Sequence, residues 1–113
     1  MKLNQSWILF LGSLAALTLT VCLGPIAKAE AASSVHIDNF TFTPQEITIT
    51  RGTTITWVNE DDIPHAIAAN NKAFRSKAMD TEQNFSFTFS EPGSYEYFCS
   101  LHPHMQGKVI VKE

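Results

Sequence analysis

Residues 95–111 read YEYFCSLHPHMQGKVIV. The stretch begins and ends with the period-two alternation that is typical of a strand with one buried and one solvated face. At its C-terminal end, for example, Val109 and Val111 occupy one face, and Lys108 and the following Lys112 occupy the other. We therefore predict strands over residues 93–98 and 107–112, joined by a loop.

The same alternation recurs upstream of this stretch. Apolar residues alternate with serine and threonine in the runs 47–49, 55–57 and 85–89, and Arg51-Gly52 between the first two runs is typical of a tight turn. Within residues 30–113 there is a single leucine, whereas Val, Ile and Thr supply 20 of the 84 positions. Helices favour leucine and sheets favour β-branched side chains, so the composition indicates a β protein.

Two further segments complete the predicted fold. Residues 35–37 and 40–42 alternate in opposite phase, which predicts a bulge or a switch between sheets at Asp38-Asn39. Residues 70–83 are polar and either irregular or weakly helical, as is typical of a surface connection. Short strands with Gly and Pro at their joints therefore predict one all-β domain, a small antiparallel β-sandwich or barrel.

The first 29 residues have a different character from the rest. A basic residue lies near the start, an apolar run covers residues 8–23, and residues 27–29 form a small-x-small exit. This is the pattern of a secretory signal peptide, so we predict cleavage before Glu30 and an exported domain of residues 30–113. The expected destination is the periplasm, with a photosynthetic lumen or a membrane-anchored outer face as alternatives. Mass spectrometry of the exported chain would test the cleavage, because its first residue should be Glu30.

Charge and cysteine content narrow the function of the exported part. It carries six basic and eleven acidic side chains, which argues against nucleic-acid binding because such proteins need basic surface. Its 84 residues can build only one modest core, which excludes a multidomain enzyme. Cys99 is the one cysteine left after cleavage, and a free thiol in an oxidising compartment indicates that something occupies it.

Four side chains with sulfur or imidazole donors are spaced as a metal site would require. Cys99, His102 and Met105 follow one another at intervals of three, and His65 lies upstream, directly after a proline. Soft and borderline donors of this kind suit copper rather than calcium or magnesium, which prefer oxygen. The alternatives are a buried structural cysteine, a nucleophile paired with histidine, or a zinc site, which seldom uses methionine.

The stretch at 95–111, together with Thr56-Trp57-Val58-Asn59 and Pro64-His65, resembles the cupredoxins, the blue copper proteins, and within them the amicyanin group. The resemblance implies a Greek-key β-sandwich that holds one copper ion. It also implies the ligands, which are three strong ones and a weak axial one: His65, Cys99, His102 and Met105.

The implied function is a one-electron shuttle between redox protein partners, without substrate turnover. We expect a monomer whose donor and acceptor dock transiently at the exposed edge of His102, on an apolar patch of Ile63, Pro64, Leu101 and Pro103. The alternative is a copper carrier or scavenger that hands over the metal itself.

Three other features receive a plainer interpretation. His36 is an ordinary histidine on a strand face, and His104 should point away from the metal because Pro103 fixes the backbone before it. The acidic run over 60–62 is typical of a solvated turn, and the alternative is that it steers a basic partner toward the copper end.

Overall fold

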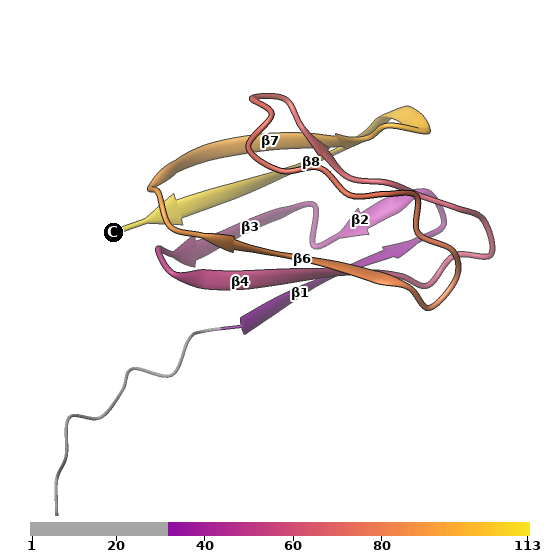
Figure 1. Ribbon diagram of the computed structural model, residues 1–113, viewed down its shortest axis with the longest axis horizontal. Coiled ribbons are helices and arrows are strands. Elements are labelled where there is room, and N and C mark those ends of the chain that lie inside the picture. The colour runs from indigo at the N-terminus through magenta and orange to yellow at the C-terminus, as the bar shows by residue number, and fades with distance from the viewer. Residues whose placement is uncertain (1–31) are drawn as a thin grey trace, which may run out of the picture.

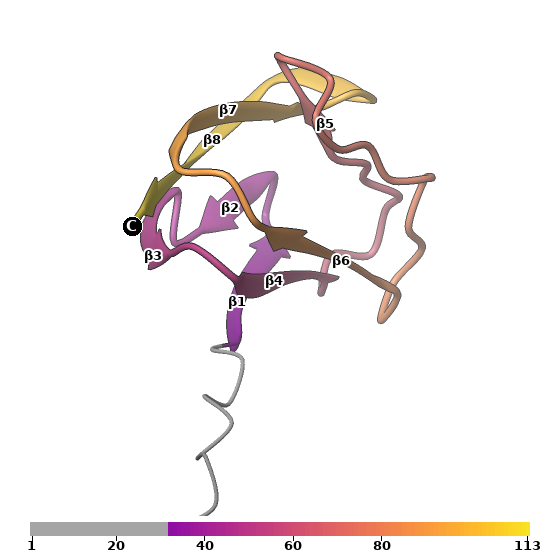
Figure 2. The same cartoon turned by 60° about the vertical axis from the view of Figure 1, so that its left-hand side comes forward.

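The computed structural model describes residues 32–113, which form strands and no helix. The strands are β1 (Ala32–Asp38), β2 (Thr41–Thr43), β3 (Glu46–Thr50), β4 (Thr53–Asn59), β5 (Ala68–Ala69), β6 (Asn84–Phe89), β7 (Gly93–Cys99) and β8 (His102–Lys112). They make two four-stranded sheets, ordered β2-β1-β4-β6 and β3-β8-β7-β5, which face each other as the two layers of a sandwich (Figures 1 and 2). The predicted all-β class is confirmed. The predicted signal peptide, residues 1–29, lies outside the described residues, and within 32–113 no helix has the length and hydropathy to cross a membrane.

The strand directions differ from the antiparallel sandwich that the sequence predicts. β1 pairs with β4 in parallel, and β3 pairs with β8 in parallel, whereas the other pairings are antiparallel. The alternation of apolar and polar residues fixes the face toward which each side chain points, but it does not encode the direction of the neighbouring strand. The chain changes sheet between β2 and β3 and again between β3 and β4, so strands that are not consecutive become neighbours.

The predicted bulge or sheet switch at Asp38-Asn39 is wrong. β1 and β2 form a hairpin within one sheet, with Asp38 paired to Thr41 across a two-residue turn. Both turn residues, Asn39 and Phe40, have positive φ angles, 49° and 57°. This turn reverses the chain and produces the phase change seen in the sequence. The change of sheet comes later, between β2 and β3.

The core lies between the sheets around Trp57, which is fully buried. Its indole packs against four aromatic rings, those of Phe74, Phe85, Phe89 and Tyr97. Phe74 belongs to the segment 70–83, for which the sequence predicts a polar surface connection. That segment is irregular, as predicted, but Phe74 and Met79 are buried in the core and so it also covers one edge of the sandwich.

β8 begins at His102 rather than at Gly107, so most of the predicted loop is extended strand. The register of β7 and β8 pairs Tyr97 with Gly107 and Cys99 with His102, with an irregularity next to Cys99. β8 begins earlier than predicted because its inward face continues through Met105, which is buried. A tight β7–β8 turn therefore ends the sandwich, and it carries two of the four predicted site residues.

Candidate metal centre

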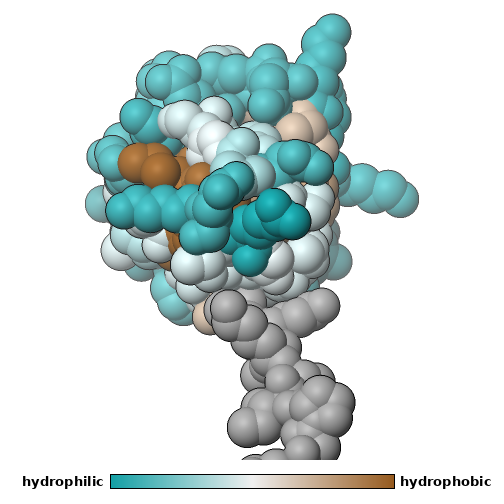
Figure 3. All heavy atoms as spheres, turned by 90° about the vertical axis from the view of Figure 1, so that its left-hand side faces the viewer, coloured by the Kyte–Doolittle hydropathy of each residue, from teal (hydrophilic) through white to brown (hydrophobic). Residues whose placement is uncertain are grey.

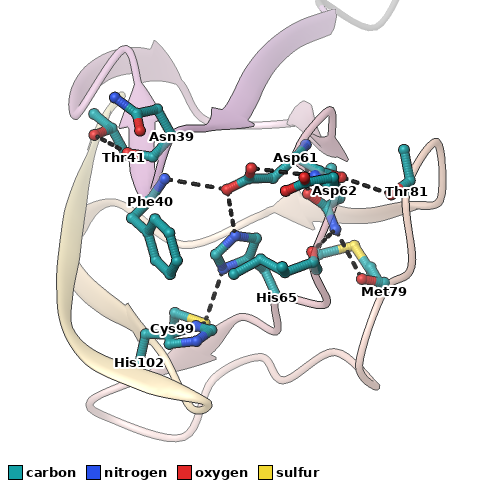
Figure 4. A network of polar contacts seen from close by, with 12 residues as sticks. Asn39, Phe40, Thr41, Asp61, Asp62, His65, Met79, Thr81, Cys99 and His102 are labelled. Carbon is teal, nitrogen blue, oxygen red and sulfur yellow. Dashed lines mark hydrogen bonds and ion pairs between the residues drawn. The ribbon is translucent and has the colours of Figure 1, made fainter.

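His65, Cys99 and His102 converge on one point, as the sequence predicts. Their ligand atoms all lie within 4.8 Å of one another, and the Cys99 Sγ atom is 3.6 Å from Nδ1 of each histidine (Figure 4). His65 lies between β4 and β5, Cys99 ends β7, and His102 begins β8. His65 and Cys99 are fully buried and His102 is half-buried. Three separate segments of the chain thus bring two imidazole nitrogens and one sulfur together.

The other residues that the sequence singles out lie as follows. Met105 is buried on β8, with 4% of its surface exposed, three positions after His102. His104, the residue before Met105 on β8, is exposed and is not among the residues whose ligand atoms converge. His36 is exposed on β1, where its Nδ1 lies 2.6 Å from a carboxylate oxygen of Glu60.

A buried carboxylate fixes the orientation of His65. Nε2 of His65 lies 2.9 Å from Oδ2 of Asp61. The pKa of Asp61 is lowered, chiefly by this hydrogen bond and next by the one from the Phe40 amide, so its carboxylate is ionised and accepts. Nε2 of His65 therefore donates to this carboxylate, and the other ring nitrogen, Nδ1, is turned toward Cys99 Sγ. A histidine that binds a metal through one nitrogen commonly uses its other nitrogen in this way.

Asp61 corrects the interpretation of the acidic run as a solvated turn. Glu60 and Asp62 are exposed, but Asp61 is buried and bonded to a predicted ligand. Composition alone does not separate the three residues. The available signal is position, because Asp61 precedes His65 by four residues inside one turn, which is close enough for a side-chain contact.

Asn59 holds the backbone on which His65 stands. Its amide nitrogen donates to the carbonyl oxygens of Ile63 and Met79, each at 2.9 Å, and its Oδ1 accepts from the Asp61 amide at 3.0 Å. Two backbone hydrogen bonds between His65 and Met79, of 3.1 and 2.7 Å, also hold the backbone of His65 in place. The site histidine is thus fixed by a fully buried polar side chain to which the sequence analysis assigns no role at the site.

The sulfur of Cys99 also has a fixed partner. The backbone amide of Ala66 donates a hydrogen bond to Sγ at 3.4 Å. Because the donor is a backbone N–H group, this hydrogen bond does not depend on the side chain at position 66. Hydrogen bonds to a cysteine sulfur are one way in which a protein tunes the redox potential of a copper–thiolate site.

Phe40 is a second residue that sequence reasoning missed. The alternation placed it on a strand face, whereas the structure places it in the β1–β2 turn with its ring against the centre. The ring centroid lies 5.5 Å from that of His65 and 5.1 Å from that of His102, edge-on to both. No pattern in the sequence links residues 40 and 102.

Residues 29–112 match the family model described as copper binding proteins of the plastocyanin/azurin family. The chain belongs to this family. An amicyanin of Paracoccus versutus is 40% identical over 96 residues, which cover 78% of this chain and 73% of that protein. An amicyanin of Paracoccus denitrificans is 35% identical over an alignment of the same length. A solved purple cupredoxin from Nitrosopumilus maritimus has a TM-score of 0.68 at 33% identity, covering 71% of this chain and 99% of that one.

The predicted membership of the cupredoxins and the predicted cofactor, copper, are confirmed. The donor set fits this metal, because two imidazole nitrogens and one cysteine sulfur meet within 4.8 Å, and a buried methionine, Met105, follows His102 by three positions on β8. Histidine, cysteine and a weak methionine are the combination found at electron-transfer copper sites. The chain is therefore a blue copper protein of the electron-transfer type. A copper-containing nitrite reductase is also a structural neighbour, with a TM-score of 0.68 at 29% identity, but the match covers only 22% of that enzyme.

Proposed function

We propose that this cupredoxin is exported and carries single electrons between two redox protein partners, without substrate turnover of its own. His65, Cys99 and His102 would hold copper as strong ligands, and Met105 would be a weak one. The observation that carries the proposal is the meeting of three donor atoms from three segments within 4.8 Å. The proposed export rests on the sequence pattern of residues 1–29 alone.

Bound copper supplies the redox chemistry by alternating between Cu(I) and Cu(II). The protein contributes a cage that is already in place. Asp61 fixes the ring of His65, and the Ala66 amide fixes the sulfur of Cys99. Donors that are held by buried hydrogen bonds have little rearrangement to make when the charge of the ion changes, which favours fast electron transfer.

His102 is the proposed port for the electron because it is the half-buried member of the site. Leu101 beside it has 49% of its surface exposed, and Pro64 and Pro103 are exposed at the same end. The face at the other end of the sandwich, shown in Figure 3, is mostly hydrophilic with a small apolar area. The small apolar surface around His102 suits a partner protein that must bind briefly and then dissociate.

A charge placed in this docking surface should slow electron transfer without changing the metal site. For Leu101→Lys we expect the electron self-exchange rate between oxidised and reduced copies to fall about tenfold, because the lysines repel in the encounter complex. Nuclear magnetic resonance line broadening measures this rate. The matched control is Thr50→Lys, an exposed position near the opposite end of the sandwich, paired with Lys112. Equal slowing in both variants would argue against docking at the His102 end.

The rival function, delivery of copper itself, requires a metal that leaves. Full burial of His65 and Cys99 favours retention over exchange. We expect the copper-loaded protein to pass through repeated oxidation and reduction in the presence of a Cu(I) chelator while keeping its metal and its colour. Voltammetry and metal analysis after each cycle would measure this. Stoichiometric loss of copper to the chelator on the first reduction would instead identify a carrier.

A further inference from the structure

The β1–β2 turn has an unusual residue at its second position. Two-residue hairpin turns in which both residues have positive φ strongly prefer Asn-Gly, because glycine adopts this conformation without steric cost. Asn39 fits the first position, but the second is occupied by Phe40 at a φ of 57°. A bulky residue in this region is a true outlier. Strained positions of this kind cluster at functional sites, which makes the phenylalanine a candidate for a role of its own.

Burial does not account for the phenylalanine. Phe40 has 47% of its surface exposed, so its ring gains only part of the stabilisation that a core phenylalanine would. Its ring instead packs against both imidazoles of the centre, nearly perpendicular to each, at interplanar angles of 88° to His65 and 87° to His102. Figure 4 shows the ring beside His65 and His102, on the side of the centre where the β1–β2 turn lies.

The turn is tied to the centre by the same carboxylate that orients His65. Oδ2 of Asp61 accepts the Phe40 amide at 3.2 Å and lies 2.9 Å from Nε2 of His65. The backbone of Phe40 and the ring of His65 are therefore both hydrogen-bonded to one oxygen atom.

We propose that Phe40 is a positioning residue that covers the copper centre: its ring shields Cys99 and the metal from small solutes and limits the rotation of the His102 imidazole. The inference rests on the proposed ligand set. It explains why a residue that strains the turn occupies a place that glycine would fill at lower cost. The covered ligands are the ones that a small anion or an alkylating reagent would have to approach.

Phe40→Gly removes the ring but preserves the turn, because glycine adopts a positive φ without steric cost. In the metal-free protein we expect the rate of alkylation of Cys99 by iodoacetamide to rise about tenfold, since thiol reactivity follows exposure. The conservative variant Phe40→Leu should show a smaller rise. Asn39→Gly changes the backbone freedom of the same turn but keeps the ring, and it should react at the wild-type rate.

The copper-loaded proteins provide a second measurement. Azide added to Cu(II)-loaded Phe40→Gly should give a new absorption band, whereas wild type and Asn39→Gly should give none. The proposed cover is wrong if Cys99 in Phe40→Gly is alkylated at the wild-type rate and azide gives no new absorption band. It is also wrong if Cys99 is alkylated as fast in Asn39→Gly as in Phe40→Gly. A wild-type protein without the blue absorption would refute the proposed function instead, and alkylation of the metal-free chain would still report on the cover.

Discussion

Replacing Cys99 by serine is expected to abolish the intense visible absorption of the copper-loaded protein. This absorption arises from charge transfer between sulfur and copper, and a serine hydroxyl is a harder and weaker donor for this metal. Sγ of Cys99 lies 3.6 Å from Nδ1 of each histidine, in the middle of the ligand set. Cys99 is also the one cysteine in the described part of the chain, so no second thiol there can take its place. Titration with Cu(II), followed by absorption and electron paramagnetic resonance spectra, would measure the loss.

The control for this variant lies on the neighbouring strand. His104→Ala removes an exposed imidazole that is not one of the converging donors, and it should keep the full absorption of wild type. Thermal unfolding of both metal-free variants would show that each is folded, since serine is similar in size to cysteine. Retention of the absorption in Cys99→Ser, or its loss in His104→Ala, would contradict the proposed ligand set.

The donor residues of the centre could be predicted because their chemistry is visible in the sequence. Cysteine, histidine and methionine at intervals of three have few common uses together, and an upstream Pro64-His65 completes a recognisable set. The geometry of a strand ending at Cys99 could also be predicted from the alternation before it. What holds the donors could not be predicted in the same way. Asp61 belongs to an acidic run whose other members are exposed, and only the folded turn decides which of the three is buried.

Two errors about the fold have a common physical origin. The direction of β1 against β4, and the place where β8 begins, depend on contacts between residues that are far apart in the sequence. Alternation reports which face of a strand is buried, and Met105 continues the buried face of β8 into a segment that contains a proline and polar residues. Phe40 reaches His65 and His102 for the same reason, because a turn docks onto the end of a different sheet.

The second large effect is expected for Gly107→Ala, in the middle of β8. Gly107 is paired with Tyr97 across β7 and β8. A Cβ atom at this glycine would lie 2.8 Å from Cε2 of Tyr97 and closer still to Cζ and the hydroxyl oxygen. The ring cannot retreat easily, because it packs against Phe42 with centroids 4.9 Å apart and against Trp57 at 5.5 Å. We expect the free energy of unfolding of the metal-free protein to fall by about 1–3 kcal/mol, the usual cost of overpacking a core. Urea unfolding followed by tryptophan fluorescence would measure it.

The sign of this effect identifies its cause. Gly107 is not among the glycines with positive φ, so alanine can adopt its backbone conformation. At such a position a change from glycine to alanine ordinarily stabilises a protein by about 0.4–1 kcal/mol, because it restricts the unfolded chain. The loss should therefore vanish or reverse when Gly107→Ala is made in a Tyr97→Leu background, since leucine lacks the atoms that clash. A persistent loss in that background would place the cause in the backbone of β8. If the ring is the cause, the copper absorption of Gly107→Ala should also shift, because Tyr97 stands two residues before Cys99 and Gly107 two residues after Met105.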